Sequence, residues 1–302
     1  MNASPPAPHR AWLAALRLPT LVAAVVPVVV GTALAYRDYR FRAGPALAAL
    51  VGALAIQIGT NLANDLYDFR KGADSGARLG PPRVLPLGWL KPDQVRRAML
   101  VAFGASVLCG LYLTAAAGWP VVAIGLASIA AGVGYTKGRW ALAYHGAGDA
   151  AVFLFFGFVA VAGTYFVQAR IVTPLAYWTA VPVGALCTAI LVVNNVRDLD
   201  ADRAAGKRTL AVRLGRGGTR IEYAALFALA FAVPLYLWWR GSLSVAALLP
   251  FAALSMAWRT LHVVLTREDG PALNAALVDT ARLHGLFGFL FAAGIAISGP
   301  GR

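Results

Sequence analysis

Charged side chains are scarce in this sequence. Only 13% of its 302 residues are Asp, Glu, Lys or Arg, whereas 59% are hydrophobic. Soluble domains usually carry about 25% charged residues, which they need to cover their surface. The composition therefore excludes an ordinary soluble protein and indicates a chain that lies in a membrane.

Cysteine is almost absent as well, with only two residues in the chain. Cys109 and Cys187 both fall inside long apolar runs, and their spacing is not typical of metal ligands. The sequence therefore excludes a fold that depends on several disulfides or on a cysteine-bound metal.

Long apolar runs dominate the sequence instead. An α-helix needs about 20 apolar residues to cross a hydrocarbon core of about 30 Å. Nine runs are close to this length: 19–36, 44–64, 98–116, 118–136, 150–168, 173–193, 222–239, 243–262 and 283–299. They lack the strict alternation of membrane β-strands. The sequence predicts an all-α, polytopic transmembrane bundle of about nine helices, with residues 1–18 as a partly ordered cytoplasmic tail and 19–302 as one membrane domain.

The basic residues are distributed unevenly among the segments that connect these runs. If the N-terminus is cytoplasmic and nine helices cross the membrane in alternating directions, 21 of the 27 Lys and Arg lie on the cytoplasmic side. This bias is typical of multi-pass membrane proteins, so the net charge of +14 does not indicate a nucleic-acid partner. The cluster of Arg37, Arg40 and Arg42 lies on the other side and does not fit the bias. Residues 32–35 also resemble a signal-peptide cleavage site, and cleavage there would reverse the assignment of every later loop.

Two motifs rich in Asp and Asn follow the second and sixth apolar runs. The first contains Asn61, Asn64, Asp65 and Asp68, and the second contains Asn194, Asp198 and Asp202. Their spacing places side chains of each motif on a shared face of a helix. Nine alternating helices bring both motifs to the cytoplasmic side, where they are expected to face each other. The shared pattern also suggests two related halves of about four helices each.

The chemistry of these motifs indicates a diphosphate site. Carboxylate and amide oxygens are the hard ligands that Mg²⁺ takes together with phosphate oxygens, and carboxylates at the end of apolar helices are usually functional. Basic residues that could neutralise phosphates lie nearby in the sequence: Arg70, Lys71, Arg83, Arg203, Lys207 and Arg208. The alternative is that the Asp residues only pair with neighbouring Arg and Lys at the membrane surface.

The two motifs, placed after the second and sixth of nine helices, resemble those of the UbiA-type membrane prenyltransferases. The resemblance extends from about residue 17 to residue 298. Residues 57–74, 78–84, 144–149, 155–157, 163–165 and 194–211 are similar to one branch, the 1,4-dihydroxy-2-naphthoate polyprenyltransferases of menaquinone biosynthesis. Gly72 stands where the wider superfamily has a third Asp, and Asp74 follows two residues later, as in the naphthoate branch. Lys137 stands where that branch is expected to have a small residue, so a contact with diphosphate is an open question.

The resemblance implies a Mg²⁺-dependent transfer of a polyprenyl chain from a prenyl diphosphate to an aromatic acid. In the naphthoate branch the acceptor loses carbon dioxide and becomes demethylmenaquinone. The resemblance also implies Mg²⁺ ligation by Asp65, Asp68, Asp198 and Asp202, with shells completed by Asn61, Asn64 and Asn194. It places the protein in the inner (cytoplasmic) membrane, in contact with lipid, with its active site facing the cytoplasm.

Three further residues are candidates for catalytic roles. Asp149, with His145 nearby, could orient or deprotonate the acceptor hydroxyl; His145 could equally be a loop residue that caps the next helix. The ring of Tyr135, like those of Tyr67 and Tyr144, could stabilise an allylic cation, although tyrosines are common at membrane interfaces.

Other functions stay open at the level of the sequence. The acceptor could be 4-hydroxybenzoate, homogentisate, a tetrapyrrole or a sugar phosphate. A cation transporter that uses intramembrane carboxylates is an alternative from another class, although transporter sites usually lie near the membrane midplane. A non-catalytic assembly factor would leave the paired motifs unexplained. The sequence does not determine the prenyl chain length, the catalytic base or the oligomeric state.

Overall fold

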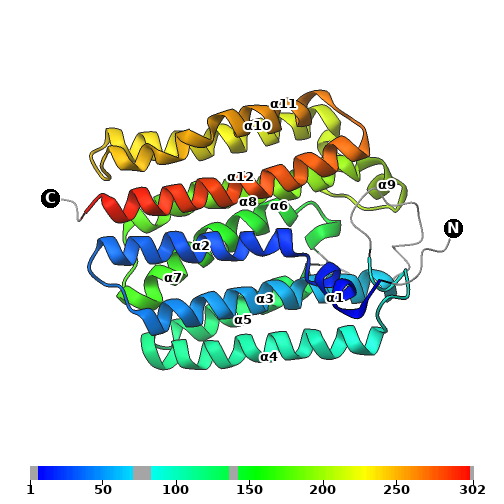
Figure 1. Ribbon diagram of the computed structural model, residues 1–302, viewed down its shortest axis with the longest axis horizontal. Helices are drawn as coiled ribbons and strands as arrows, with labels where there is room; N and C mark the ends of the chain where they lie inside the picture. Colours follow the sequence, from blue (N-terminus) through cyan, green and yellow to red (C-terminus); the bar gives the residue numbers. More distant parts are fainter. Residues whose placement is uncertain (1–5, 71–82, 136–141, 300–302) are drawn as a thin grey trace.

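The computed structural model describes residues 6–70, 83–135 and 142–299, and every regular element in these ranges is a helix. The long helices run side by side along one axis (Figure 1). In chain order the elements are α1 (Pro8–Leu16), α2 (Leu18–Arg37), α3 (Ala43–Arg70), α4 (Pro92–Ala117), α5 (Pro120–Gly134), the 3₁₀ turn η1 (Leu142–Tyr144), α6 (Gly148–Val152), the π-helix η2 (Phe153–Val159), α7 (Ala160–Ala169), α8 (Pro174–Arg197), α9 (Leu199–Ala204), α10 (Leu210–Trp239), the 3₁₀-helix η3 (Val245–Ala253), α11 (Leu254–Thr266) and α12 (Gly270–Ile297).

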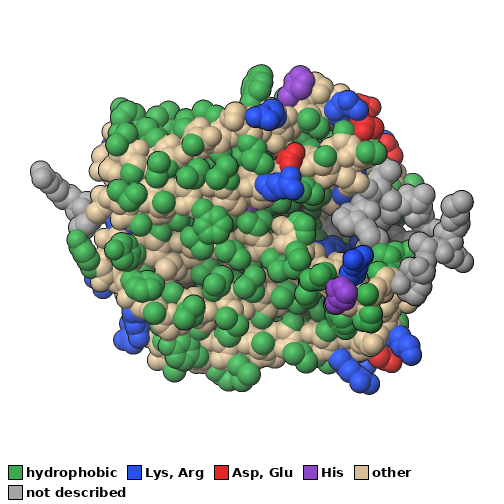
Figure 2. All heavy atoms as spheres, in the orientation of Figure 1, with side chains coloured by type: hydrophobic (Ala, Val, Ile, Leu, Met, Phe, Trp, Pro, Cys, Tyr) green, Lys and Arg blue, Asp and Glu red, His purple; other side chains and the backbone are tan. Residues whose placement is uncertain are grey.

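The helices confirm the predicted membrane bundle. Within the described ranges, eight helical segments are long and apolar enough to cross a membrane, and the shorter α5 is also apolar. Each of the nine expected runs coincides with one of these segments. Hydrophobic side chains cover most of the face of the bundle that Figure 2 shows, as expected for helices that face lipid. The chain is therefore a multi-pass membrane protein, whereas the predicted relation between its two halves stays a prediction.

The two chain termini lie at opposite ends of the bundle (Figure 1). Helices α1 and α9 lie at the end near the N-terminus, together with the C-terminal ends of α3 and α8. Both Asp motifs occur at these helix ends. We call this the motif end and the opposite one the far end.

Helix α1 occupies half of the segment that we expected to be a partly ordered tail. Pro8 starts the helix, as proline often does at a first helical position. Ala11 and Ala15 are buried in a hydrophobic cluster with Leu62 and Leu66 of α3. The helix ends at Arg17, whose left-handed backbone (φ 52°) turns the chain into α2.

Two helices begin well before the apolar runs that predicted them. Thr209 caps α10 by accepting a hydrogen bond from the amide of Val212 (3.2 Å), and Asp269 caps α12 by accepting one from Ala272 (2.9 Å). The N-terminal segments of both helices, which contain Arg213 in α10 and Asp279 in α12, extend the apolar spans at the motif end. The apolar runs predicted only the part of each helix that is rich in hydrophobic residues.

The core lies between pairs of long helices. Helix α3 packs on α4, α2 on α12 and α8 on α10. Tyr165, Tyr223, Phe287 and Phe291 are among the largest fully buried side chains. Helix α8, which leads into the second motif, is the most buried of the long helices. The packing therefore fixes the position of that motif.

The π-helix η2 approaches α8 very closely at two glycines. A Cβ atom on Gly184 would lie 2.8 Å from the carbonyl oxygen of Phe153 and 3.1 Å from the Cα of Gly157. Only glycine permits this contact. Single π turns inside helical segments often occur at functional sites.

The arginines of the far end that did not fit the charge bias have structural contacts. Arg42 and Arg170 donate hydrogen bonds to the carbonyl of Ala116, near the C-terminus of α4 (3.4 and 2.7 Å), and basic side chains are favourable there. Arg37 is paired with Asp38 at 2.8 Å and donates to the carbonyl of Ser242 at 3.0 Å. These arginines hold the far-end loops together.

Candidate active site

A cavity of ≈ 540 Å³ opens at the motif end, between α1, α2, α3, α8 and α12. We call it the polar cavity. Its wall contains residues of both motifs: Asn61, Asn64, Asp68, Asn194, Asp198 and Asp202. Arg83, Tyr135, Tyr144, Asp149 and Lys207 also line it. The fold therefore brings together residues that lie more than 100 positions apart in the sequence.

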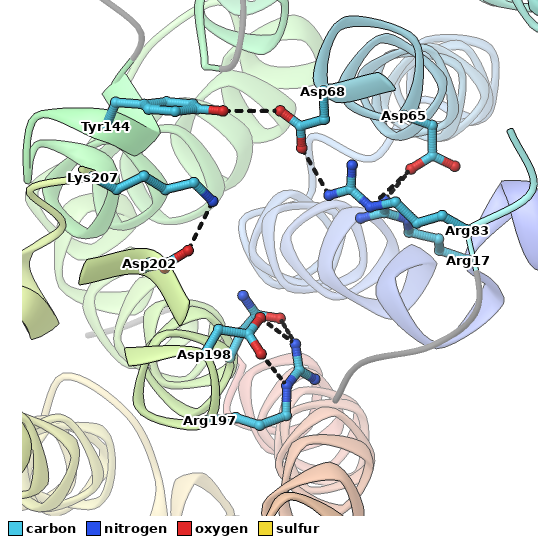
Figure 3. Close-up of polar contacts among 10 residues, drawn as sticks. Arg17, Asp65, Asp68, Arg83, Tyr144, Arg197, Asp198, Asp202 and Lys207 are labelled. Carbon is cyan, nitrogen blue, oxygen red and sulfur yellow. Dashed lines mark hydrogen bonds and ion pairs between the residues drawn. The ribbon is translucent and has the colours of Figure 1, made fainter. Parts of the chain in front are cut away.

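The carboxylates of the first motif are paired with two arginines (Figure 3). Asp68 lies 2.7 Å from the Nη2 of Arg83 and accepts a hydrogen bond from the hydroxyl of Tyr144 at 3.2 Å. Asp65 is paired with Arg17, and the Nε of Arg83 lies 3.8 Å from it. Asp65 is only 2% exposed and lies behind the wall of the cavity, while Asp68 lines the wall.

Asn61 ties the first motif to the junction between α1 and α2. Its amide group donates to the carbonyl of Leu16 (3.1 Å) and to the hydroxyl of Thr20 (3.0 Å). Arg17 lies between these two partners in the chain. The hydrogen bonds of Asn61 therefore help to hold Arg17 where it meets Asp65.

The second motif has its own pair of cations. Arg197 forms a bidentate ion pair with Asp198, with distances of 2.8 and 2.6 Å, and also donates to Asn194 at 2.7 Å. Lys207 lies 2.8 Å from Asp202. Figure 3 shows these pairs opposite the Asp65 and Asp68 pairs, across the site.

The donor set suits a metal ion that is bound together with phosphate. Among the described residues, no group of three or more His, Cys, Asp and Glu is placed to hold a metal ion by itself. Mg²⁺, however, is usually bound by one or two carboxylates and by substrate phosphate oxygens. Asp68, Asp198 and Asp202, with the amide oxygens nearby, provide such ligands, and the paired cations suit a diphosphate.

Tyr144 connects the two motifs. Its hydroxyl donates to Asp68, and the ammonium group of Lys207 lies 5.2 Å from the centre of its ring. Burial, followed by the charge of Asp68 and its hydrogen bond, raises the pKa of the Tyr144 phenol well above its ordinary value. The phenol is therefore neutral at physiological pH and acts as a hydrogen-bond donor.

Asp149 lies on the wall of the polar cavity at the start of α6. It is 5% exposed and has no ion-pair partner among the described residues. A Cβ atom on the neighbouring Gly148 would lie 3.2 Å from the hydroxyl oxygen of Tyr135, so Tyr135 lies beside the start of α6. The structure thus places Asp149 and Tyr135, two of the three residues predicted to have catalytic roles, close together on the cavity wall.

Four further predicted residues of the described chain do not line the polar cavity. His145 is exposed, and its backbone carbonyl accepts a hydrogen bond from Arg213 at 2.8 Å. Three of the predicted phosphate-binding residues are exposed at the motif end and do not line the cavity: Arg70, Arg203 and Arg208. Lys71 and Lys137 lie outside the described residues.

Two arginines of the site were not among the predicted site residues. Arg197 is part of the second motif and is flanked by Asn194 and Asp198, so its position in the sequence was a usable signal. Arg17 gave no such signal, because it reaches Asp65 only through the turn between α1 and α2.

A second cavity, of ≈ 230 Å³, lies between α2, α3, α4, α5 and α7. We call it the apolar cavity, because its wall consists almost entirely of hydrophobic and small residues. It adjoins the polar cavity at five shared residues: Gln57, Thr60, Tyr135, Val152 and Phe156. Phe156 belongs to the π-helix η2. A ligand with a charged head and a long apolar tail could therefore occupy both cavities.

Comparison with known proteins identifies the family. A model of the UbiA prenyltransferase family matches residues 24–294. The chain belongs to this family. The predicted resemblance is thereby confirmed, and the named relatives also confirm the predicted naphthoate branch.

Several members of the UbiA family are similar to this chain over most of its length. A 1,4-dihydroxy-2-naphthoate octaprenyltransferase of Escherichia coli is 36% identical over 307 residues, which cover 96% of each chain. A protein of the same name from Mycobacterium tuberculosis is 37% identical over 269 residues, or 89% of this chain and 91% of the relative.

Solved structures of UbiA homologues share the fold. A homologue from Archaeoglobus fulgidus superimposes with a TM-score of 0.65 at 14% identity, covering 95% of this chain and 99% of the other. A structure of an Archaeoglobus fulgidus homologue bound to DMAPP and Mg²⁺ gives 0.64 at 14% identity, with 93% and 99% covered. At this identity the likeness concerns the fold alone.

Proposed function

We propose that this UbiA-family protein transfers a polyprenyl chain from a prenyl diphosphate to 1,4-dihydroxy-2-naphthoate, with loss of carbon dioxide, to give demethylmenaquinone. The observation that carries the proposal is that both Asp motifs line one cavity, which adjoins an apolar cavity. The relatives from Escherichia coli and Mycobacterium tuberculosis support the naphthoate acceptor through their names.

The diphosphate occupies the polar cavity in this proposal. Arg83 and Lys207 line the wall and donate to phosphate oxygens. Asp68, Asp198 and Asp202 would hold Mg²⁺, with the neighbouring Asn side chains orienting them. When bound, the metal would supply positive charge that offsets the charge of the departing diphosphate. The bound homologue from Archaeoglobus fulgidus supports this use of a divalent metal.

The prenyl chain extends from the polar cavity into the apolar cavity. Tyr135 and Phe156 line both cavities, so their rings lie where the first carbons of the chain would pass. Aromatic ring faces attract cations. These rings therefore stabilise the positive charge that develops on the allylic carbon when its bond to the diphosphate oxygen breaks.

The acceptor lies beside Asp149, which accepts a hydrogen bond from a ring hydroxyl and so orients the ring. The electron-rich ring carbon forms the new carbon–carbon bond to the allylic carbon. The carboxylate on that ring carbon then leaves as carbon dioxide, and the ring regains its aromaticity. Because the polar cavity is at the end of the bundle that we expect in the cytoplasm, soluble acceptor reaches it from that side of the inner membrane.

The test is prenyl transfer in membranes that contain the expressed protein. Dihydroxynaphthoate and a labelled octaprenyl diphosphate are supplied with Mg²⁺ or with EDTA, and 4-hydroxybenzoate replaces the naphthoate in a parallel sample. We expect a Mg²⁺-dependent prenylated naphthoate and release of carbon dioxide. If only 4-hydroxybenzoate gave a product, the assignment of dihydroxynaphthoate as the acceptor would be wrong. If folded protein gave no product with any aromatic acceptor, the assignment of the protein as a prenyltransferase would be wrong.

Two variants separate the candidates for contact with the acceptor. Asp149→Asn removes the charge on the cavity wall, and His145→Ala removes an exposed ring outside it. A neutral amide accepts a hydrogen bond from the acceptor hydroxyl more weakly than a carboxylate does and cannot take its proton. We therefore expect Asp149→Asn to lower the rate by about 100-fold, while His145→Ala stays near wild type. The opposite ranking would move the role to His145.

A further inference from the structure

Three glycines line the apolar cavity at positions where the space that a side chain would fill is empty. They are Gly110 on α4, Gly125 on α5 and Gly163 on α7. A Cβ atom built on any of them would meet no heavy atom within 4 Å. Each glycine thus faces open space inside the cavity.

Other glycines of the same wall differ from these three. A Cβ on Gly132 would lie 2.4 Å from the hydroxyl oxygen of Thr60, and one on Gly52 would lie 3.3 Å from the Cβ of Cys109. Those two glycines allow helices to approach each other. Close packing does not explain Gly110, Gly125 or Gly163.

All three glycines lie in the half of the bundle away from the diphosphate site. Helix α4 starts at the motif end, and Gly110 is in its second half. Helix α5 runs in the opposite direction, and Gly125 is in its first half. Gly163 is in the second half of the span Gly148–Ala169, which starts beside Asp149. They therefore line the deep part of the apolar cavity.

Glycine inside a helix is unfavourable compared with alanine, so three glycines here reduce helix stability without improving packing. What they provide is room. On the basis of the proposed function, we infer that Gly110, Gly125 and Gly163 keep the deep part of the apolar cavity open and thereby set how long a prenyl chain the protein accepts. Short chains end before reaching these positions, whereas long chains pass them.

The experiment compares Leu substitutions at the three positions with a matched control. Gly104→Leu is the control, because Gly104 is also on α4 and also has no atom within 4 Å, but it is exposed and does not line the cavity. Each protein receives equal amounts of geranyl, farnesyl and octaprenyl diphosphate together with dihydroxynaphthoate. Mass spectrometry then measures the ratio of the products, which does not depend on the amount of folded protein.

We expect Gly110→Leu, Gly125→Leu and Gly163→Leu to lower the ratio of octaprenyl to geranyl product by about tenfold or more, because each Leu side chain would occupy the open space that a long chain needs and a short chain does not reach. Gly104→Leu should leave the ratio unchanged. Equal ratios in all four variants and the wild type would overturn the inference. Absence of any product from the wild type would instead contradict the proposed function.

A second measurement, on the wild type, tests the inference without turnover, so it applies even if the Leu variants lose all activity. Cys109 lines the apolar cavity next to Gly110. In the wild type, the reaction of Cys109 with a membrane-permeant maleimide is monitored by peptide mass spectrometry. Octaprenyl diphosphate should slow this reaction, and geranyl diphosphate should not. Equal protection by both, or none by octaprenyl diphosphate, would overturn the inference without any need for turnover.

Discussion

Neighbouring residues of the second motif differ sharply in their surroundings. Asp202 is buried on the wall of the polar cavity and paired with Lys207. Asp200, on the same short helix α9, has a side chain that is 75% exposed and is paired with Arg216 at 3.0 Å. On a helix, side chains that are two residues apart point to different faces. The acidic residues of the motif are therefore not equivalent.

Asp202→Asn and Asp200→Asn make this difference testable. Both changes remove one negative charge from α9 and keep the shape of the side chain. We expect Asp202→Asn to lower prenyl transfer by about 100-fold or more, as does loss of one group that stabilises charge in an active site. Asp200→Asn should keep a rate near that of the wild type. Similar losses in both variants would mean that the motif acts through its total charge and not through the cavity.

At the scale of the elements, the contact between η2 and α8 connects the fold to the site. The π-helix carries Phe156, which lines both cavities, and α8 leads into the second motif. Gly157 and Gly184 allow the two backbones to meet. Because both elements carry cavity residues, a change in their separation would alter the polar and apolar cavities together.

Gly184→Ala tests this contact. The added Cβ would lie 2.8 Å from the carbonyl oxygen of Phe153, so the helices must move apart. We expect the variant to lose roughly 1–3 kcal/mol of stability, the usual cost of overpacking, and to melt at a lower temperature in detergent. Gly104→Ala adds the same methyl group in open space at an exposed position and is the control. Equal melting temperatures of the two variants would contradict the conclusion that η2 and α8 are in close contact at Gly184.

The elements also show how far the sequence could predict the structure. In the described part of the chain, hydrophobic length alone located the eight helical segments that are long enough to span a membrane and the shorter apolar helix α5, and helical spacing grouped the Asp and Asn residues on shared faces. The ion pair between Arg17 and Asp65 could not be predicted, because it joins residues 48 positions apart through a left-handed turn. The close contact at Gly157 and Gly184 is equally non-local. Long-range contacts of this kind depend on packing and have no periodic signal in one sequence.

At the scale of the whole molecule, nine crossings require the two termini to lie on opposite sides of the membrane. The structure agrees, because the N-terminus and the C-terminus lie at opposite ends of the bundle. The charge bias predicts that the motif end faces the cytoplasm, and this orientation stays a prediction. Arg42 and Arg170, which count against this assignment, instead donate hydrogen bonds to the end of α4.

Fusions to the two termini test this orientation. We expect green fluorescent protein to be fluorescent at the N-terminus and dark at the C-terminus, because it does not fold after export. Alkaline phosphatase should give the reverse result, since it is active only after export. The reverse pattern for both reporters would place the polar cavity outside the cytoplasm and separate it from a cytoplasmic acceptor.

The pairing of charges at the motif end has one more consequence, for how the protein tolerates chelators. Asp65, Asp68, Asp198 and Asp202 each have a cation within the chain: Arg17, Arg83, Arg197 and Lys207. A buried carboxylate that already has a counter-charge does not need a dissolved ion to remain folded. EDTA should therefore stop turnover without shifting the melting curve, so that loss of chemistry can be told apart from loss of structure in a single preparation.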